Sequence, residues 1–305
     1  MKFYGDYDAI EPCRKNRPMQ TLGAQLKDLG GGFVVRRLLP SARQRSVGPF
    51  LFFDHFGPTV ATAGDDHDVR PHPHIGLATV TYLFEGAMLH RDSTGAVQRI
   101  ESGAINWMTA GRGIVHSERT PDDLRTRTRT IHGLQLWTAL PDELEEAAPR
   151  FDHTPAAAIP QVERGAVLVR VLVGQAFGVE SPVRAASPTV YLDMTWARGA
   201  EIELPPLAAE QAVYGIDAPL RINGEAVEPH RMTLAEPGAS LRLAASQPGR
   251  AVLIGGDPLG ERYIWWNFVS SRRQRITEAA DDWAARRFPA VPGETELMEM
   301  PERRP

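Results

Sequence analysis

Two pairs of polar residues dominate this chain, and the members of each pair are separated by one residue. The first pair is His72 and His74, and the second is His116 and Glu118. In a β-strand, residues i and i+2 point to the same face, so two facing strands would bring three imidazoles and one carboxylate together. Nitrogen and oxygen donors of this kind form a mixed metal shell. The spacing therefore predicts a metal site made of His72, His74, His116 and Glu118.

The segments around both pairs have the composition of strands and turns. Residues 109–115 contain two glycines, which suit a tight turn that leads into a strand at His116. Residues 76–84 follow His74 and are rich in β-forming side chains. The interval between His74 and His116 has room for about three or four short strands. A single His-x-His pair is more often solvated or hydrogen-bonded than ligating, but two such pairs at this separation favour a metal site.

The ligand types narrow the choice of metal. Three neutral imidazoles and one carboxylate would leave a divalent ion with a net charge of about +1, which suits Fe(II) and also Mn, Co, Ni, Cu or Zn. Four protein ligands on a six-coordinate ion leave two positions open, as dioxygen chemistry requires, whereas zinc more naturally stops at four ligands. We therefore expect Fe(II).

The same residues lie in segments that together resemble the pirin branch of the cupin superfamily. The segments are RPHPHIG at 70–76, TVTYLFEG at 79–86, HRDS at 90–93, WMTAGRGIVHSE at 107–118, FDHFGP at 53–58 and WNFVS at 266–270. The resemblance extends from about residue 33 to about residue 288 and is most specific between residues 70 and 118.

The resemblance implies two stacked cupin barrels and a bound iron, with His72, His74, His116 and Glu118 at the positions of the pirin ligands. For bacterial members it implies quercetin 2,3-dioxygenase activity, and for animal members a role as a transcriptional co-regulator. Two positions depart from the pattern. Pirins usually carry a basic residue where this chain has Ile75 and an acidic residue where it has Ala78. Many other cupins use a glutamate near position 78 as a ligand, so Glu118 is the only carboxylate candidate here.

Composition places the chain among ordinary globular proteins. It has 305 residues, of which 42% are hydrophobic and 24% are charged, and this length can hold two domains. A net charge of −4 gives no basic footprint for nucleic acid. No apolar run is long enough to span a membrane, and the first residues do not read as a secretory signal. A single cysteine, Cys13, excludes an intrachain disulfide. We therefore expect a cytoplasmic protein.

Short strand-like runs with turn signals about every ten residues predict an all-β barrel or sandwich. The resemblance implies that this all-β fold consists of two stacked cupin barrels, to which we add a short C-terminal helix. The expected divisions are an N-terminal extension at 1–32, a metal-binding barrel at 33–150, a degenerate barrel at 151–270, and a helix and tail at 271–305. Gly30-Gly31-Gly32 reads as a flexible joint. The segment 141–149 is acidic and bounded by prolines, which predicts one helical turn with a solvated charged face.

The second half repeats the rhythm of the first without its ligands. Where the first half has Pro71 to His74, the second has Pro205-Pro206-Leu207-Ala208, so we expect the second barrel to be structural and free of metal. Asn223-Gly224, between two short β-forming runs, predicts a tight hairpin turn.

One helix can be read near the C-terminus. Ile276, Ala279, Ala280, Trp283 and Ala284 form an apolar stripe at helical spacing. Residues 271–274 fit a capping box, and Pro289 would end the helix. The tail after Val291 is expected to be loose.

The remaining histidines are expected to be structural. His55 favours a hydrogen-bonded role over a ligand role. His90 and His132 are expected beside the ligands or in the core, and His67, His153 and His230 lie among turn residues that favour exposure.

Two functions fit these observations. The first is a metal-dependent dioxygenase that opens flavonols such as quercetin, or a related small aromatic enol, with O2, and Glu118 would be both ligand and general base. The alternative is a metal-dependent, redox-sensing regulator that binds a protein partner and catalyses nothing. Quercetin bleaching under air by the metal-loaded protein would distinguish them.

Overall fold

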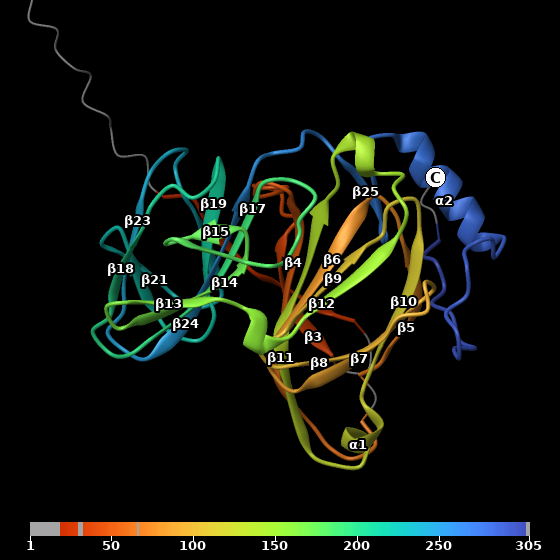
Figure 1. Cartoon of the computed structure of the whole chain (residues 1–305), viewed down its shortest axis with the longest axis horizontal. Coiled ribbons are helices and arrows are strands. Elements are labelled where there is room, and N and C mark those ends of the chain that lie inside the picture. Colours follow the sequence, from red (N-terminus) through yellow and green to blue (C-terminus); the bar gives the residue numbers. More distant parts are fainter. Residues whose placement is uncertain (1–18, 30–32, 66, 303–305) are drawn as a thin grey trace, which may run out of the picture.

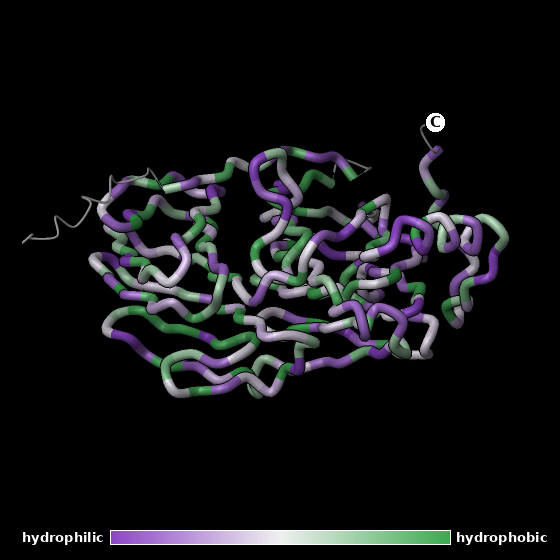
Figure 2. Tube along the Cα trace, turned by 90° about the horizontal axis from the view of Figure 1, so that it is seen from above, coloured by the Kyte–Doolittle hydropathy of each residue, from purple (hydrophilic) through white to green (hydrophobic). Residues whose placement is uncertain are grey.

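The computed structural model describes residues 19–29, 33–65 and 67–302. Two β-domains lie side by side, and the C-terminal helix lies at the outer end of the first (Figure 1). The expected joint at residues 30–32 falls outside the described residues. Hydrophilic and hydrophobic residues follow one another over short intervals along the chain (Figure 2), as expected for a fold of short strands with one buried face.

The first barrel consists of two facing antiparallel sheets. Its seven-stranded sheet has the order β12-β9-β6-β11-β4-β3-β2, and its four-stranded sheet has the order β5-β10-β7-β8. The larger sheet contains β2 (Gln25–Asp28), β3 (Val34–Leu39), β4 (Phe50–Ala61), β6 (Leu77–Glu85), β9 (Ile105–Thr109), β11 (Arg129–Ala139) and β12 (Arg150–Thr154). The smaller sheet contains β5 (Val69–His74), β7 (Ala87–Asp92), β8 (Val97–Glu101) and β10 (Ile114–Arg119).

The second barrel repeats this plan with orders β1-β22-β19-β24-β17-β14-β13 and β18-β23-β20-β21, and a small β15-β16 pair. Its strands are β1 (Thr21–Gly23), β13 (Gln161–Arg164), β14 (Val167–Val173), β15 (Gln175–Ala176), β16 (Val179–Glu180), β17 (Thr189–Trp196), β18 (Glu201–Leu204), β19 (Glu210–Gly215), β20 (Leu220–Ile222), β21 (Glu225–Val227), β22 (Arg231–Leu234), β23 (Leu241–Ala244) and β24 (Gly249–Gly256). The hairpin predicted at Asn223-Gly224 is confirmed, with φ of 49° and 85°.

The other elements are short. They are α1 (Asp122–Arg125), two 3₁₀ turns at η1 (Asp142–Leu144) and η2 (Ala156–Ala158), β25 (Tyr263–Trp265), β26 (Phe268–Ser270) and α2 (Arg273–Ala284). The stripe predicted for α2 is confirmed, because Ile276, Ala279, Ala280 and Trp283 are buried. In the part of the chain that the structure describes, no helix is both long and apolar enough to cross a membrane.

Strand pairing shows which segments at the ends of the first barrel belong to which sheet. Residue 150 is the first of β12, which pairs with β9 and so extends the first barrel to Thr154. Within the predicted N-terminal extension, β1 pairs with β22 of the second barrel, and β2 pairs with β3 of the first. The chain before the first barrel therefore contributes a strand to each domain.

The barrels share one apolar core that includes a polar link. Tyr82 from the first barrel packs with Tyr191 and Tyr214 from the second. The Tyr82 hydroxyl donates to Asp193 at 2.7 Å and accepts from Arg170 at 2.8 Å. Because an unpaired hydroxyl or carboxylate is costly in a core, these bonds favour one relative position of the two barrels.

One prediction for the segments near α2 is wrong and another holds only in part, and Glu145 explains both departures. The helix has no side-chain cap, because Ser271 instead donates its hydroxyl and its backbone N–H to Glu145. In the acidic segment expected to be solvated, the side chains exposed as predicted are Asp142, Glu143 and Glu146. Glu145, however, is 3% exposed and pairs with Arg262 at 3.0 Å. The helical turn predicted there is present as η1. A buried partner that is distant in sequence thus outweighs a local capping pattern.

The expectation of a loose tail is also wrong. Val291 is buried, and Glu294 accepts hydrogen bonds from Ser117 at 2.7 Å and from Arg119. The backbone N–H of Met298 donates to the carbonyl of Pro71 at 2.8 Å. The C-terminal segment 291–298 therefore lies against the outer side of β5 and β10.

Replacing Glu294 by Ala should destabilise the protein by about 1–3 kcal/mol, because the buried Ser117 hydroxyl loses its acceptor and Arg119 loses one of its carboxylate partners. Urea unfolding measures this loss, and Glu299→Ala at an exposed tail position is the matched control. Hydrogen bonding from Arg119 lowers the pKa of Glu294 from its ordinary 4.5, so its contribution should be present at neutral pH and disappear as the pH falls below about that value. Equal stability of both variants at pH 7 would contradict the anchoring role.

Candidate metal centre

The predicted ligands lie on β5 and β10, two neighbouring strands of the smaller sheet in the first barrel. The strands are antiparallel, with His116 opposite His72 and Ile114 opposite His74. Because β5 is an edge strand, it pairs with β10 on one side only. Pro71 and Pro73, which have no N–H to donate, can therefore alternate with the histidines in this strand. The i, i+2 spacing then points His72 and His74 into the barrel on the same face as His116.

Three imidazoles converge at this point. Ligand atoms of His72, His74 and His116 all lie within 4.8 Å of one another. The Nε2 atoms of His74 and His116 are 3.2 Å apart, and the ring centroids of His72 and His116 are 4.3 Å apart. These distances allow the three residues to share one ion.

Hydrogen bonds select which ring nitrogen is free. The Nδ1 atom of His72 donates to the carbonyl of Arg70 at 2.8 Å, and that of His74 donates to the carbonyl of Asn267 at 3.1 Å. A neutral imidazole with a proton on Nδ1 has its lone pair on Nε2. Both residues therefore present Nε2 to the cluster.

The electrostatics also suit a metal. Burial lowers the pKa of His72 to about 4, and it lowers the pKa values of His74 and His116 well below their ordinary 6.5. All three side chains are therefore neutral at pH 7, which is the form that binds metals. Three buried neutral imidazoles with convergent nitrogen atoms fit a divalent transition metal, so this group could hold one.

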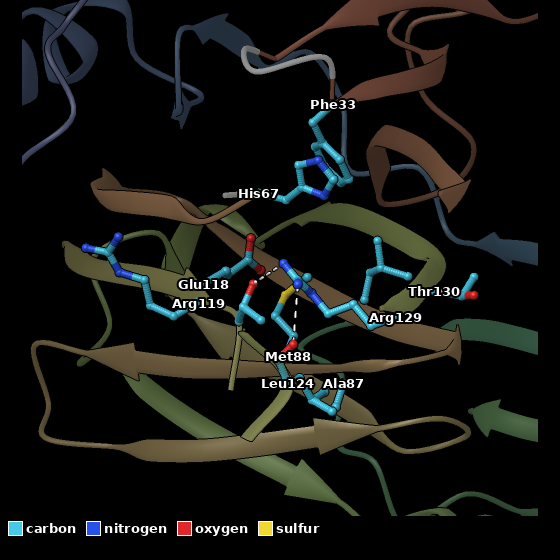
Figure 3. Close-up of a pocket in the computed structure, with 11 residues that line it drawn as sticks. Phe33, His67, Ala87, Met88, Glu118, Arg119, Leu124, Arg129 and Thr130 are labelled. Carbon is cyan, nitrogen blue, oxygen red and sulfur yellow. Dashed lines mark hydrogen bonds between the residues drawn. The ribbon is translucent and has the colours of Figure 1, made fainter. Parts of the chain in front are cut away.

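Glu118 lies next to this group but is not a member of it. The Thr81 hydroxyl, from the opposite sheet, donates to its carboxylate at 3.4 Å, and burial raises the pKa of Glu118 to about 7. The side chain also lines a small cavity of about 30 Å³, large enough for about one water molecule. Across the cavity, the rings of His67 and Phe33 lie 5.2 Å apart (Figure 3).

Aromatic rings line one side of the histidine cluster. Trp137 makes an edge contact with His74, with 5.2 Å between the ring centroids, and Phe52 stacks on Trp137 at 4.1 Å. The guanidinium of Arg37 lies over Phe52 and pairs with Asp54. This side of the barrel is therefore an apolar wall with a charged outer rim.

Ile75 and Ala78, the two positions that depart from the pirin pattern, do not face the three convergent histidines. Ile75 packs in the cluster that contains Phe268 and α2, and Ala78 packs in the core between the barrels. Both side chains point away from the convergent imidazoles, because each lies on the opposite strand face from an inward-facing neighbour.

The other histidines only partly follow expectation. His55 is hydrogen-bonded as predicted, to Tyr214 at 2.8 Å and to His132 at 2.7 Å. The exposure predicted for His67, His153 and His230 is wrong, because all three are half-buried, and His153 bonds Asn106 at 2.7 Å. Turn composition alone did not reveal the neighbours that cover them.

The sequence did not predict the contacts that three further residues, His90, Asp92 and Asn267, make beside the convergent histidines. His90 stands 3.4 Å from His116 between Nδ1 atoms, and Asp92 bonds His90 at 2.9 Å. The i, i+2 spacing of His90 and Asp92 is the same signal that identified the ligands and could have found this pair. The contact of Asn267 uses its backbone carbonyl, which no side-chain pattern reveals.

Comparison with known proteins agrees with this geometry. The family model described as Pirin matches residues 32–138, and the Pirin C-terminal cupin domain matches residues 191–289. A pirin-like protein of Caulobacter vibrioides is 43% identical over 87% of this chain and 92% of its own length. Pirin of Rattus norvegicus is 34% identical over 83% of this chain and 87% of its own.

The structural comparison covers almost the whole chain. The crystal structure of a quercetin 2,3-dioxygenase from Acinetobacter baumannii superposes with a TM-score of 0.87 and 34% identity, over 94% of this chain and 96% of that chain. The predicted fold of two cupin barrels with a C-terminal helix is thus confirmed. The chain belongs to the pirin family, with one cupin domain in each half.

Proposed function

We propose that this protein is a metal-dependent dioxygenase that opens flavonols such as quercetin with O2. The observation that carries the proposal is the convergence of His72, His74 and His116 inside one barrel, with Glu118 on the same face of β10. The likeness to a quercetin 2,3-dioxygenase over nearly the whole chain supports this choice of substrate class.

The three histidines would hold the ion through their Nε2 atoms, and we propose Glu118 as the fourth ligand and Fe(II) as the metal. When bound, the ion would supply open positions for O2 and for the substrate's enolic hydroxyl, and it would lower the pKa of that hydroxyl.

Glu118 is the residue best placed to receive the proton of the enolic hydroxyl. A carboxylate held beside the ion would lie within reach of a hydroxyl that binds one of the open positions, and it could take the proton of that hydroxyl. The Thr81 hydroxyl lies 3.4 Å from this carboxylate and 2.9 Å from the side-chain oxygen of Gln135, so its one proton is shared between the two acceptors. The resulting enolate would react with O2, opening the heterocycle and releasing carbon monoxide.

The aromatic wall would orient the substrate. The apolar rings of Trp137 and Phe52 beside His74 would favour an aromatic substrate such as a flavonol over a charged one. The buried surroundings of the imidazoles would also keep bulk water away from the enolate.

Replacing His72 by Ala should remove bound metal, because one of three convergent nitrogen donors is lost. Metal content after Fe(II) loading and desalting measures this, with His153→Ala as a control, since His153 lies in the same barrel outside the convergent group. Full metal content in His72→Ala would contradict its ligand role.

Replacing Glu118 by Ala should abolish quercetin consumption. The test uses protein reconstituted anaerobically with Fe(II) and then exposed to air, and follows both the flavonol absorption band and carbon monoxide. Glu101→Ala, at an exposed position of β8, is the matched control. Undiminished turnover in Glu118→Ala would refute the role as base, and absence of turnover by iron-loaded wild-type protein would refute the choice of substrate.

A further inference from the structure

A second polar pair faces the ligands from the neighbouring strand. In the ladder between β7 and β10, Asp92 lies opposite His116, and His90 lies opposite Glu118. The exposed fractions of His90 and Asp92 are 5% and 0%. Buried polar groups are costly unless they are hydrogen-bonded, so this pair must be satisfied by its neighbours.

The hydrogen bonds of this pair have a defined direction. Asp92 Oδ2 lies 2.9 Å from His90 Nε2, and a carboxylate can only accept, so the proton of neutral His90 is on Nε2. His90 Nδ1 is then an acceptor, and it faces His116 Nδ1 at 3.4 Å. His116 must donate from Nδ1, which leaves its Nε2 lone pair free toward His74.

The pair is held firmly in this arrangement. The other oxygen of Asp92, Oδ1, accepts from the backbone N–H of Thr94 at 2.8 Å, from its hydroxyl at 2.6 Å, and from the N–H of Ala96 at 3.2 Å. The ring of Phe151 stacks on His90 with 4.2 Å between centroids and 15° between planes. Neither side chain can turn away without losing these contacts.

His116 therefore differs from the other two histidines. The Nδ1 atoms of His72 and His74 donate to backbone carbonyls, whereas that of His116 faces a chain that ends in a carboxylate. Negative charge behind a ligating imidazole makes it a stronger donor and fixes its tautomer.

We infer that His90 and Asp92 are positioning residues of the metal centre, which hold His116 in the tautomer that binds the ion and make it a stronger ligand. This inference rests on the proposed metal site. It assigns the HRDS segment of β7 a role in metal affinity that is separate from direct ligation.

The first test is Asp92→Asn, with cobalt(II) as the probe because its visible absorption reports the ligands around it. The backbone N–H groups of Thr94 and Ala96, which now donate to Asp92 Oδ1, would bind the amide oxygen of the new side chain in its place. The NH2 group of that side chain would then face His90 Nε2. His90 would then carry its proton on Nδ1, and the proton of His116 would move to Nε2, where it blocks the metal. Cobalt(II) affinity should fall about 10–100-fold.

The second test compares two changes at His90. In His90→Gln, the amide oxygen can accept from His116 and the amide NH2 can donate to Asp92, so affinity should stay within a few-fold of wild type. His90→Leu breaks both bonds and should lose about as much affinity as Asp92→Asn. A purely space-filling role would not separate Gln from Leu in this order.

The matched control is His132→Gln, which alters a second histidine pair, with His55, at the contact between the barrels. Its cobalt(II) affinity should be unchanged. Unaltered affinity in Asp92→Asn, or equal losses in His90→Gln and His90→Leu, would overturn the inference while leaving the metal site intact. Absence of cobalt(II) binding by the wild-type protein would instead overturn the metal site and the inference together. If Asp92→Asn fails to fold, the comparison at His90 still decides.

Discussion

The barrel that contains the three convergent histidines depends on one constraint, the two-residue alternation of β5 and β10. On the inner face, alternation gathers His72, His74 and His116. On the outer face, it offers Ile75 and Val115 to the cluster of α2 and Ser117 to Glu294. Both faces of β5 and β10 are therefore covered. The C-terminal segment packs on their outer face and stabilises the strands that carry the three histidines on the inner face.

Burying three imidazoles requires that each be neutral and that each place its remaining proton on an acceptor. Two of these acceptors are backbone carbonyls, and the third is His90, backed by Asp92. The candidate metal centre thus combines histidines on two strands, the His90–Asp92 pair on a third strand, and a carbonyl from the segment between β25 and β26. Each of these acceptors satisfies the Nδ1–H group of one histidine, which would otherwise be buried without a partner, and leaves the Nε2 lone pair pointing inward.

The two barrels share an architecture but contribute differently. The first carries the convergent histidines, and the second packs against the larger sheet of the first through a core that contains Tyr82, Tyr191 and Tyr214. The bonds of Tyr82 to Asp193 and Arg170 cross this contact and favour one orientation. Since β6 also carries Thr81, which reaches Glu118, the second barrel supports the strand behind the proposed catalytic carboxylate.

The sequence by itself determined the features that depend on local periodicity and turn chemistry. These are the inward faces of the two polar pairs, the hairpin at Asn223-Gly224, the apolar stripe of α2 and the all-β architecture. Tertiary structure decided what periodicity leaves open, because alternation specifies a face but neither register nor distant partners. The register between β10 and β5 shifts after His116, so that Glu118 lies opposite Val69, and Glu118 is not a member of the group of three convergent histidines. The partners of Ser271, Ser117 and His74 are Glu145, Glu294 and Asn267, each more than a hundred residues away, and only the folded chain brings such groups within hydrogen-bonding distance.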